Sequence, residues 1–82
     1  MKLQDLFYFE PIARDFIAVY NKEKTLNLFN IPAKDLLGFI NSNKNTNGTY
    51  TFGCQTLAQE DVEDFIENIF PKLSKESSNL KE

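Results

Sequence analysis

The stretch that decides the fold is Phe16-Ile17-Ala18-Val19-Tyr20-Asn21-Lys22-Glu23-Lys24-Thr25-Leu26-Asn27-Leu28-Phe29-Asn30-Ile31. Two apolar runs, Phe16–Tyr20 and Thr25–Ile31, flank a short polar loop, an arrangement typical of a β-hairpin. Antiparallel pairing with Tyr20 opposite Thr25 gathers four apolar side chains on one face, namely Ile17, Val19, Leu26 and Leu28. Because a register shift of one residue would separate these four, the sequence predicts both the hairpin and this register.

The opposite face of this hairpin carries three aromatic side chains, Phe16, Tyr20 and Phe29. Two interpretations of this face stay open. If a helix covers the face, the three rings are buried in the core. If nothing covers it, the rings form a protein interface, because large exposed apolar patches are rare on monomers. A second copy of the chain is one partner that fits the interface interpretation.

Residues 11–23 also fit a helix with one apolar side, and this alternative changes the function. In that case Thr25–Ile40 resembles the helix-turn-helix pattern of DNA-binding domains, with Asn30 in the turn and apolar positions at Ile31, Leu36 and Ile40. The resemblance implies a mostly α, winged helix-turn-helix fold, with Asn47–Phe52 in the wing. It also implies nucleic-acid contacts through four lysines, which are Lys22, Lys24, Lys34 and Lys44. The net charge of −3 disfavours this alternative, since basic phosphate contacts drive affinity for DNA.

Two later segments have helical patterning. The first is predicted from Pro32 to about Ser42, with apolar side chains at i, i+3, i+4 and i+7, namely Ala33, Leu36, Leu37 and Ile40. The second is predicted from Leu57 to Phe70, with Thr56 as its cap and Pro71 as its end or kink. Between them, residues 49–53 alternate polar and aromatic side chains as a half-buried strand does.

These elements predict an α+β fold of one small domain, with an antiparallel sheet of three to four strands and two helices. The sheet contains the hairpin and the strand at 49–53, and Leu6–Phe9 adds an edge strand. Residues 1–73 form the compact domain. Residues 74–82 are polar, so we expect them to fray or be disordered.

The predicted C-terminal helix presents a row of carboxylates opposite its apolar face, namely Glu60, Glu63, Asp64 and Glu67. Three interpretations stay open. The row is a solvated helix face, a surface that docks on a basic protein partner, or a general-acid or cation site. The last is disfavoured because a lone helix lacks the converging loop ligands that a Ca²⁺ site normally uses.

The residue inventory disfavours catalysis. The 82 residues include no histidine, which excludes Ser-His and Cys-His nucleophile pairs and histidine metal sites. The single cysteine, Cys54, forms no internal disulfide, and we expect it to pack as a small apolar residue between strand and helix. No apolar run is long enough to span a membrane, and the first residues show no secretory signal, so we expect a cytoplasmic chain.

Together these patterns predict a non-catalytic protein-binding module without cofactor or metal. It is plausibly a small acidic regulator or inhibitor that acts by occupying a macromolecular partner. The aromatic residues would supply the binding energy, and the carboxylate row would provide steering. The alternative is a winged helix-turn-helix DNA-binding regulator.

Overall fold

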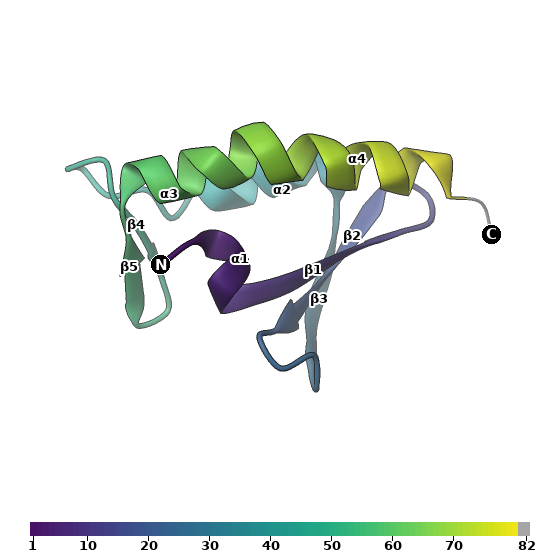
Figure 1. Cartoon of the computed structure of the whole chain (residues 1–82), viewed down its shortest axis with the longest axis horizontal. Helices are drawn as coiled ribbons and strands as arrows, with labels where there is room; N and C mark the ends of the chain where they lie inside the picture. Colours follow the sequence, from purple (N-terminus) through teal and green to yellow (C-terminus); the bar gives the residue numbers. More distant parts are fainter. Residues whose placement is uncertain (81–82) are drawn as a thin grey trace.

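Residues 16–31 form a hairpin within a three-stranded antiparallel sheet of order β1-β2-β3 (Figure 1). Strands β1, β2 and β3 span Phe7–Ile12, Phe16–Asn21 and Asn27–Pro32. The computed structural model describes residues 1–80 and confirms the predicted α+β class. It also confirms an edge strand near the beginning of the chain, preceded by the single-turn helix α1, Leu3–Leu6. The alternative helix over 11–23 is wrong, because that segment contributes to two strands.

The register of β2 and β3 differs from the predicted one. Val19 lies opposite Phe29, and the register shifts between Val19 and Tyr20. The loop is longer than predicted because the Asn21 side chain accepts hydrogen bonds from the backbone N–H groups of Thr25 and Leu26, at 2.8 and 3.0 Å. The strand therefore resumes only after Leu26. The predicted apolar face is wrong, since Leu26 and Leu28 are exposed by 58% and 42%.

The inner face of the sheet packs on helices and holds the core. Ile17 is fully buried there, with Val19 and Phe29 on the same face. Helix α2, Ala33–Asn41, adds the fully buried Leu36 and Ile40 and confirms the predicted helix at 32–42. Burying a side chain of this size stabilises the fold by roughly 1.5–3 kcal/mol.

Residues 50–52 form strand β4, Tyr50–Phe52, as predicted, but this strand does not join the main sheet. It pairs with β5, Gln55–Leu57, in a separate two-stranded sheet. Thr56 therefore lies in a strand, where its Oγ1 is 3.2 Å from that of Thr51, and it does not cap a helix. The helix begins two residues later than predicted, after the N-cap residue Ala58.

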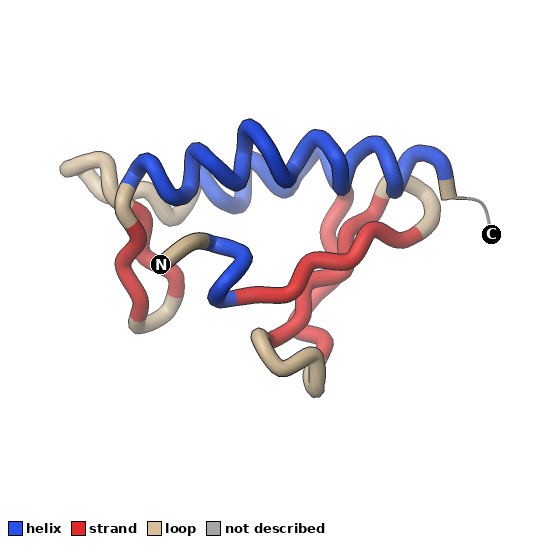
Figure 2. The backbone as a smooth tube through the Cα atoms, in the orientation of Figure 1, coloured by secondary structure: helices blue, strands red, loops and turns tan. Residues whose placement is uncertain are grey.

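Residues 59–79 form one long helical rod along one side of the molecule (Figures 1 and 2). It consists of α3, Gln59–Asp64, the π-helical turn η1, Phe65–Ile69, and α4, Phe70–Asn79. Pro71 does not end it. The Phe70 N–H donates to the Phe65 carbonyl five residues back, which makes this turn wider than an α-helical turn. The wider turn accommodates Pro71, which has no N–H and whose ring crowds the carbonyl four residues before it.

The polar residues from Ser74 onward differ from the expected frayed tail, because α4 continues to Asn79. Ser77 is fully buried, and its hydroxyl lies 2.7 Å from the Ile12 carbonyl oxygen and 2.8 Å from that of Phe16. These bonds fasten the helix to the β1–β2 hairpin. The rest of the expected tail, Lys81 and Glu82, lies outside the described residues.

Candidate functional site

The face of the three-stranded sheet that points away from the core is the first candidate site, and we call it the outer face. Residues opposite one another on paired strands share a face, which arranges these side chains in three rows. The rows are Ile12, Phe16 and Pro32; Glu10, Ala18 and Asn30; and Tyr8, Tyr20 and Asn27, with the unpaired Leu28 beside Asn27 at the bulge. Within residues 1–80, none of them belongs to the core cluster that the inner face forms with the helices.

The outer face and the loop beside it carry most of the exposed apolar bulk. Three of the five large apolar side chains exposed among residues 1–80 lie here, namely Phe16, Leu26 and Leu28. The ring centroids of Tyr8 and Tyr20 are 6.0 Å apart, and the Lys24 ammonium lies 3.9 Å from the Tyr8 ring centre. At an exposed site such a cation–π contact contributes about 0.5–1 kcal/mol. One end of the outer face is therefore an aromatic pair covered on one side by a cation.

The structure separates the three predicted aromatic residues. Phe16 and Tyr20 lie on the outer face, but Phe29 lies on the inner face, with its ring centroid 5.1 Å from that of Phe39 in α2. The predicted common face is therefore wrong for Phe29. Two members of the outer face were missed. Leu28 was assigned inward by the wrong register, and Tyr8 could be placed only by knowing that it lies opposite Tyr20.

A hollow of about 630 Å³ opens at the Phe16 end of the outer face, between the β1–β2 turn, the start of α2, and α4. Its lining is mixed, with the apolar Phe16, Pro32, Ala33, Leu37 and Phe70 beside Arg14, Asp15, Lys34 and Ser74. The turn is tight, since Arg14 and Asp15 both have positive φ angles, 68° and 62°. The hollow can receive one apolar side chain of a partner next to Phe16.

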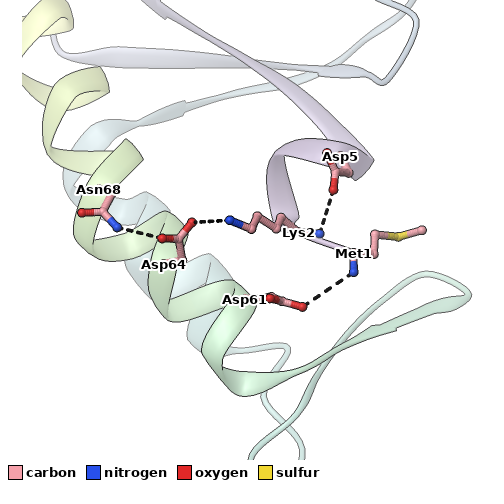
Figure 3. Close-up of polar contacts among 6 residues, drawn as sticks. All are labelled: Met1, Lys2, Asp5, Asp61, Asp64 and Asn68. Carbon is pink, nitrogen blue, oxygen red and sulfur yellow. Dashed lines mark hydrogen bonds and ion pairs between the residues drawn. The ribbon is translucent and has the colours of Figure 1, made fainter.

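The second candidate site is the predicted carboxylate row, which the structure divides. Glu60, Glu63 and Glu67 are exposed, and we call them the acidic stripe. No ion pair to any of them is seen in residues 1–80, although the Gln59 amide donates to Glu63 at 2.9 Å. Asp64 instead points toward the N-terminal segment, where its carboxylate is 3.4 Å from the Lys2 ammonium (Figure 3).

The environment of Asp64 explains its separation from the stripe. The Asn68 amide donates to its carboxylate at 2.7 Å, and this bond is the main reason that the pKa of Asp64 is lowered from 3.8. The bond and charge of Lys2 lower the pKa further, while desolvation opposes them. Nearby, Asp61 lies 3.6 Å from the α-ammonium of Met1 (Figure 3). Both aspartates therefore hold the N-terminal segment against α3.

Among residues 1–80, no three His, Cys, Asp or Glu side chains meet in a way that could hold a metal ion. Cys54 is exposed, contrary to the expected packing, because Gly53-Cys54 is the two-residue loop between β4 and β5. Gly53 has a φ of +63°, the backbone conformation that such a loop requires at its first position. No helix in the described part of the chain is long and apolar enough to cross a membrane.

The helix-turn-helix interpretation is wrong, because residues 25–32 form a loop and strand β3 where that motif requires a helix. The four lysines assigned to it are divided among three separate segments. Lys22 and Lys24 are in the β2–β3 loop, Lys34 is in α2, and Lys44 is near Tyr50 in the loop before β4. Searches for similar proteins found no matching family model, curated protein or solved structure.

Proposed function

We propose that this chain is a non-catalytic protein-binding module that acts by occupying a macromolecular partner, as a small acidic regulator or inhibitor does. The observation that supports this proposal is the concentration of exposed Phe16, Leu26 and Leu28 on and beside a sheet face whose side chains lie outside the core cluster, although Ala18 at its centre is buried. Apolar side chains gathered in this way are typical of a protein interface. The hollow beside Phe16 provides a pocket for an anchoring side chain, the feature that carries most binding energy at interfaces.

The acidic stripe has a different role in this proposal. Its carboxylates are exposed on the long helix, and the outer face lies across the core from that helix (Figure 1). The stripe therefore acts through its electric field, which speeds the encounter with a basic partner. Because dissolved salt screens such a field, association should slow as the salt concentration rises.

The experiment is a pull-down with the tagged chain from an extract of its native cells, with and without nuclease. The test variant is Tyr20→Glu, which places a charge at the centre of the aromatic row. The matched control is Thr46→Glu, which adds the same charge to an exposed residue of the loop before β4, away from the three-stranded sheet. Far-UV circular dichroism of each variant shows whether it is folded.

We expect a stoichiometric protein that survives nuclease, is retained by Thr46→Glu and is lost with Tyr20→Glu. Since Tyr20 is half-buried and its replacement by a charge lowers stability in its own right, Leu26→Glu is the second test variant. Leu26 is 58% exposed, so its charge cannot unfold the core. Equal capture by the wild type and a folded Leu26→Glu, Tyr20→Glu double variant would contradict the proposal, as would recovery of nucleic acid alone.

A further inference from the structure

Strand β3 is an edge strand with few of the features that usually protect such an edge; the one present within it is the bulge at Leu28. It contains no charged residue, and its only proline, Pro32, is its last residue. The other edge strand, β1, carries Glu10 and Pro11 and lies against α4. Natural sheets use charges, prolines and covering elements to prevent edge-to-edge pairing. One edge of this sheet is thus protected and the other is open.

From this contrast we infer that two copies of this chain pair through antiparallel β3 strands, joining their two three-stranded sheets into one. This inference goes beyond the proposed function, which needs only the outer face of a single copy. The partner is a second copy because the open edge matches itself in hydrogen bonding, in side-chain pattern and in charge.

The hydrogen-bonding phase of β3 follows from one contact at its end. The Ala33 N–H donates to the Asp15 carbonyl at 2.7 Å, just beyond the Phe16–Pro32 pair. Hydrogen-bonded and non-hydrogen-bonded pairs alternate along an antiparallel ladder. The N–H and carbonyl of Asn30 therefore point to the open edge. Pro32 has the same phase as Asn30, so its nitrogen also points to the open edge. The missing N–H of Pro32 therefore removes no hydrogen bond to β2.

Only one two-fold register uses this edge well. With the axis at Asn30, the two copies of Asn30 exchange two backbone hydrogen bonds, and Leu28 of each copy lies opposite Pro32 of the other. An axis at Phe29 would also let Asn30 of one copy exchange hydrogen bonds with Leu28 of the other, but it would set the apolar Leu28 beside the polar Asn30; an axis at Pro32 would lack a donor.

The same register aligns the side chains of the outer face. Leu28 of one copy lies beside Pro32 of the other, from which an apolar row continues through Phe16 to Ile12. Symmetry produces this apolar row twice, with the polar row of Glu10, Ala18 and Asn30 between. The exposed Leu28 thereby gains an apolar neighbour, and on the inner face Phe29 lies opposite Ile31. A shift by two residues would place apolar rows beside the polar one.

Charge also favours self-pairing. Each copy has a net charge of −3, but β3 itself is uncharged, so no like charges meet at the axis. Beyond the strand, the two-fold brings the β2–β3 loop, with exposed Lys24, toward the first turn of α2, with exposed Asp35. Opposite charges at the two ends of the paired strands support the register.

The test measures mass by sedimentation equilibrium for the wild type, Asn30→Lys, Asn30→Asp and an equimolar mixture of the two variants. Like charges directly opposite across a strand pair are destabilising, so each variant alone should raise the dimer dissociation constant by roughly tenfold or more. The mixture pairs lysine with aspartate and should restore the dimer. Asn41→Lys, at an exposed position of α2, is the control and should keep the wild-type mass.

A cross-link tests the register independently in a Cys54→Ser background. Asn30→Cys should form a disulfide-linked dimer on mild oxidation, whereas Glu10→Cys, on a strand that the register keeps apart from its copy, should not. A wild type that stays monomeric at the highest soluble concentration would overturn the inference. So would charge variants that both keep the dimer mass, or a mixture that stays monomeric.

Discussion

The Ser77 hydroxyl is a polar group that the fold buries completely and uses as a tie between α4 and the β1–β2 hairpin. It has one hydrogen to share between two carbonyl oxygens. Ser77→Ala leaves both carbonyls without this donor and should cost roughly 1–3 kcal/mol. Urea unfolding should show a lower midpoint with an unchanged m value. Ser78→Ala, one residue on and exposed, is the control; equal midpoints for the two variants would contradict the prediction.

Asp64 makes stability depend on pH through its contacts with Asn68 and Lys2. Because these contacts lower its pKa in the folded chain, the ionised carboxylate favours the folded state. This contribution is complete above the ordinary value of 3.8 and is lost as the pH falls through the lowered pKa. Asp64→Asn should therefore flatten the loss of stability on acidification, measured by thermal unfolding below pH 5. Glu67→Gln removes a charge from the same helical rod without an ion pair in residues 1–80 and should keep the wild-type slope.

Two glycines in different elements should respond to alanine with opposite signs. Gly38 lies within α2, and a Cβ there would meet open space, so Gly38→Ala should raise stability by roughly 0.5–1 kcal/mol. Gly53 also has space, but its φ of +63° lies in the left-handed region that L side chains rarely adopt, and Gly53→Ala should lower stability by about 1–2 kcal/mol. Thermal unfolding measures both. A shift of the same sign in both variants would contradict this account.

Helices and strands that depend on residues close together in the sequence could be predicted, but the pairing between strands could not. Helix α2 follows from the spacing of Leu36 and Ile40, which depends only on neighbouring residues. The β2–β3 register depends on how the Asn21 side chain closes the loop, a choice that apolar alternation does not reveal. The wrong register then misplaced Leu28 and Phe29. Likewise, Thr56 was predicted to cap the helix but lies in strand β5, because it pairs with a residue of β4.

The candidate site was predictable to a similar extent. The exposed glutamates follow from helical periodicity, whereas the removal of Asp64 from their row depends on Lys2, a residue 62 positions away. The buried role of Ser77 was equally hidden, since its partners are carbonyls of the hairpin and a polar segment gives no periodic signal. Contacts between distant segments thus account for most of the differences.

For the whole molecule, the outer face and the acidic stripe lie on different sides of the core, so we expect separable kinetic effects on binding of the captured partner. Glu63→Lys with Glu67→Lys should slow association roughly tenfold at low salt and remove its salt dependence. Leu26→Glu should instead speed dissociation. Surface plasmon resonance at two salt concentrations distinguishes them. If the Glu63→Lys, Glu67→Lys variant changed only the dissociation rate, the acidic stripe would lie within the interface with the partner, which would contradict this prediction.

The tie from Ser77 to Ile12 joins residues 65 positions apart, and it has a consequence for the order in which the protein forms. The β1–β2 hairpin is made before residue 77, so it has no contact with the end of α4 until synthesis reaches that residue. Until then the hairpin lacks its anchor in α4, and the open edge of β3 is available to other nascent chains of the same kind. Sheet pairing between chains on one messenger could therefore begin before either chain has finished folding.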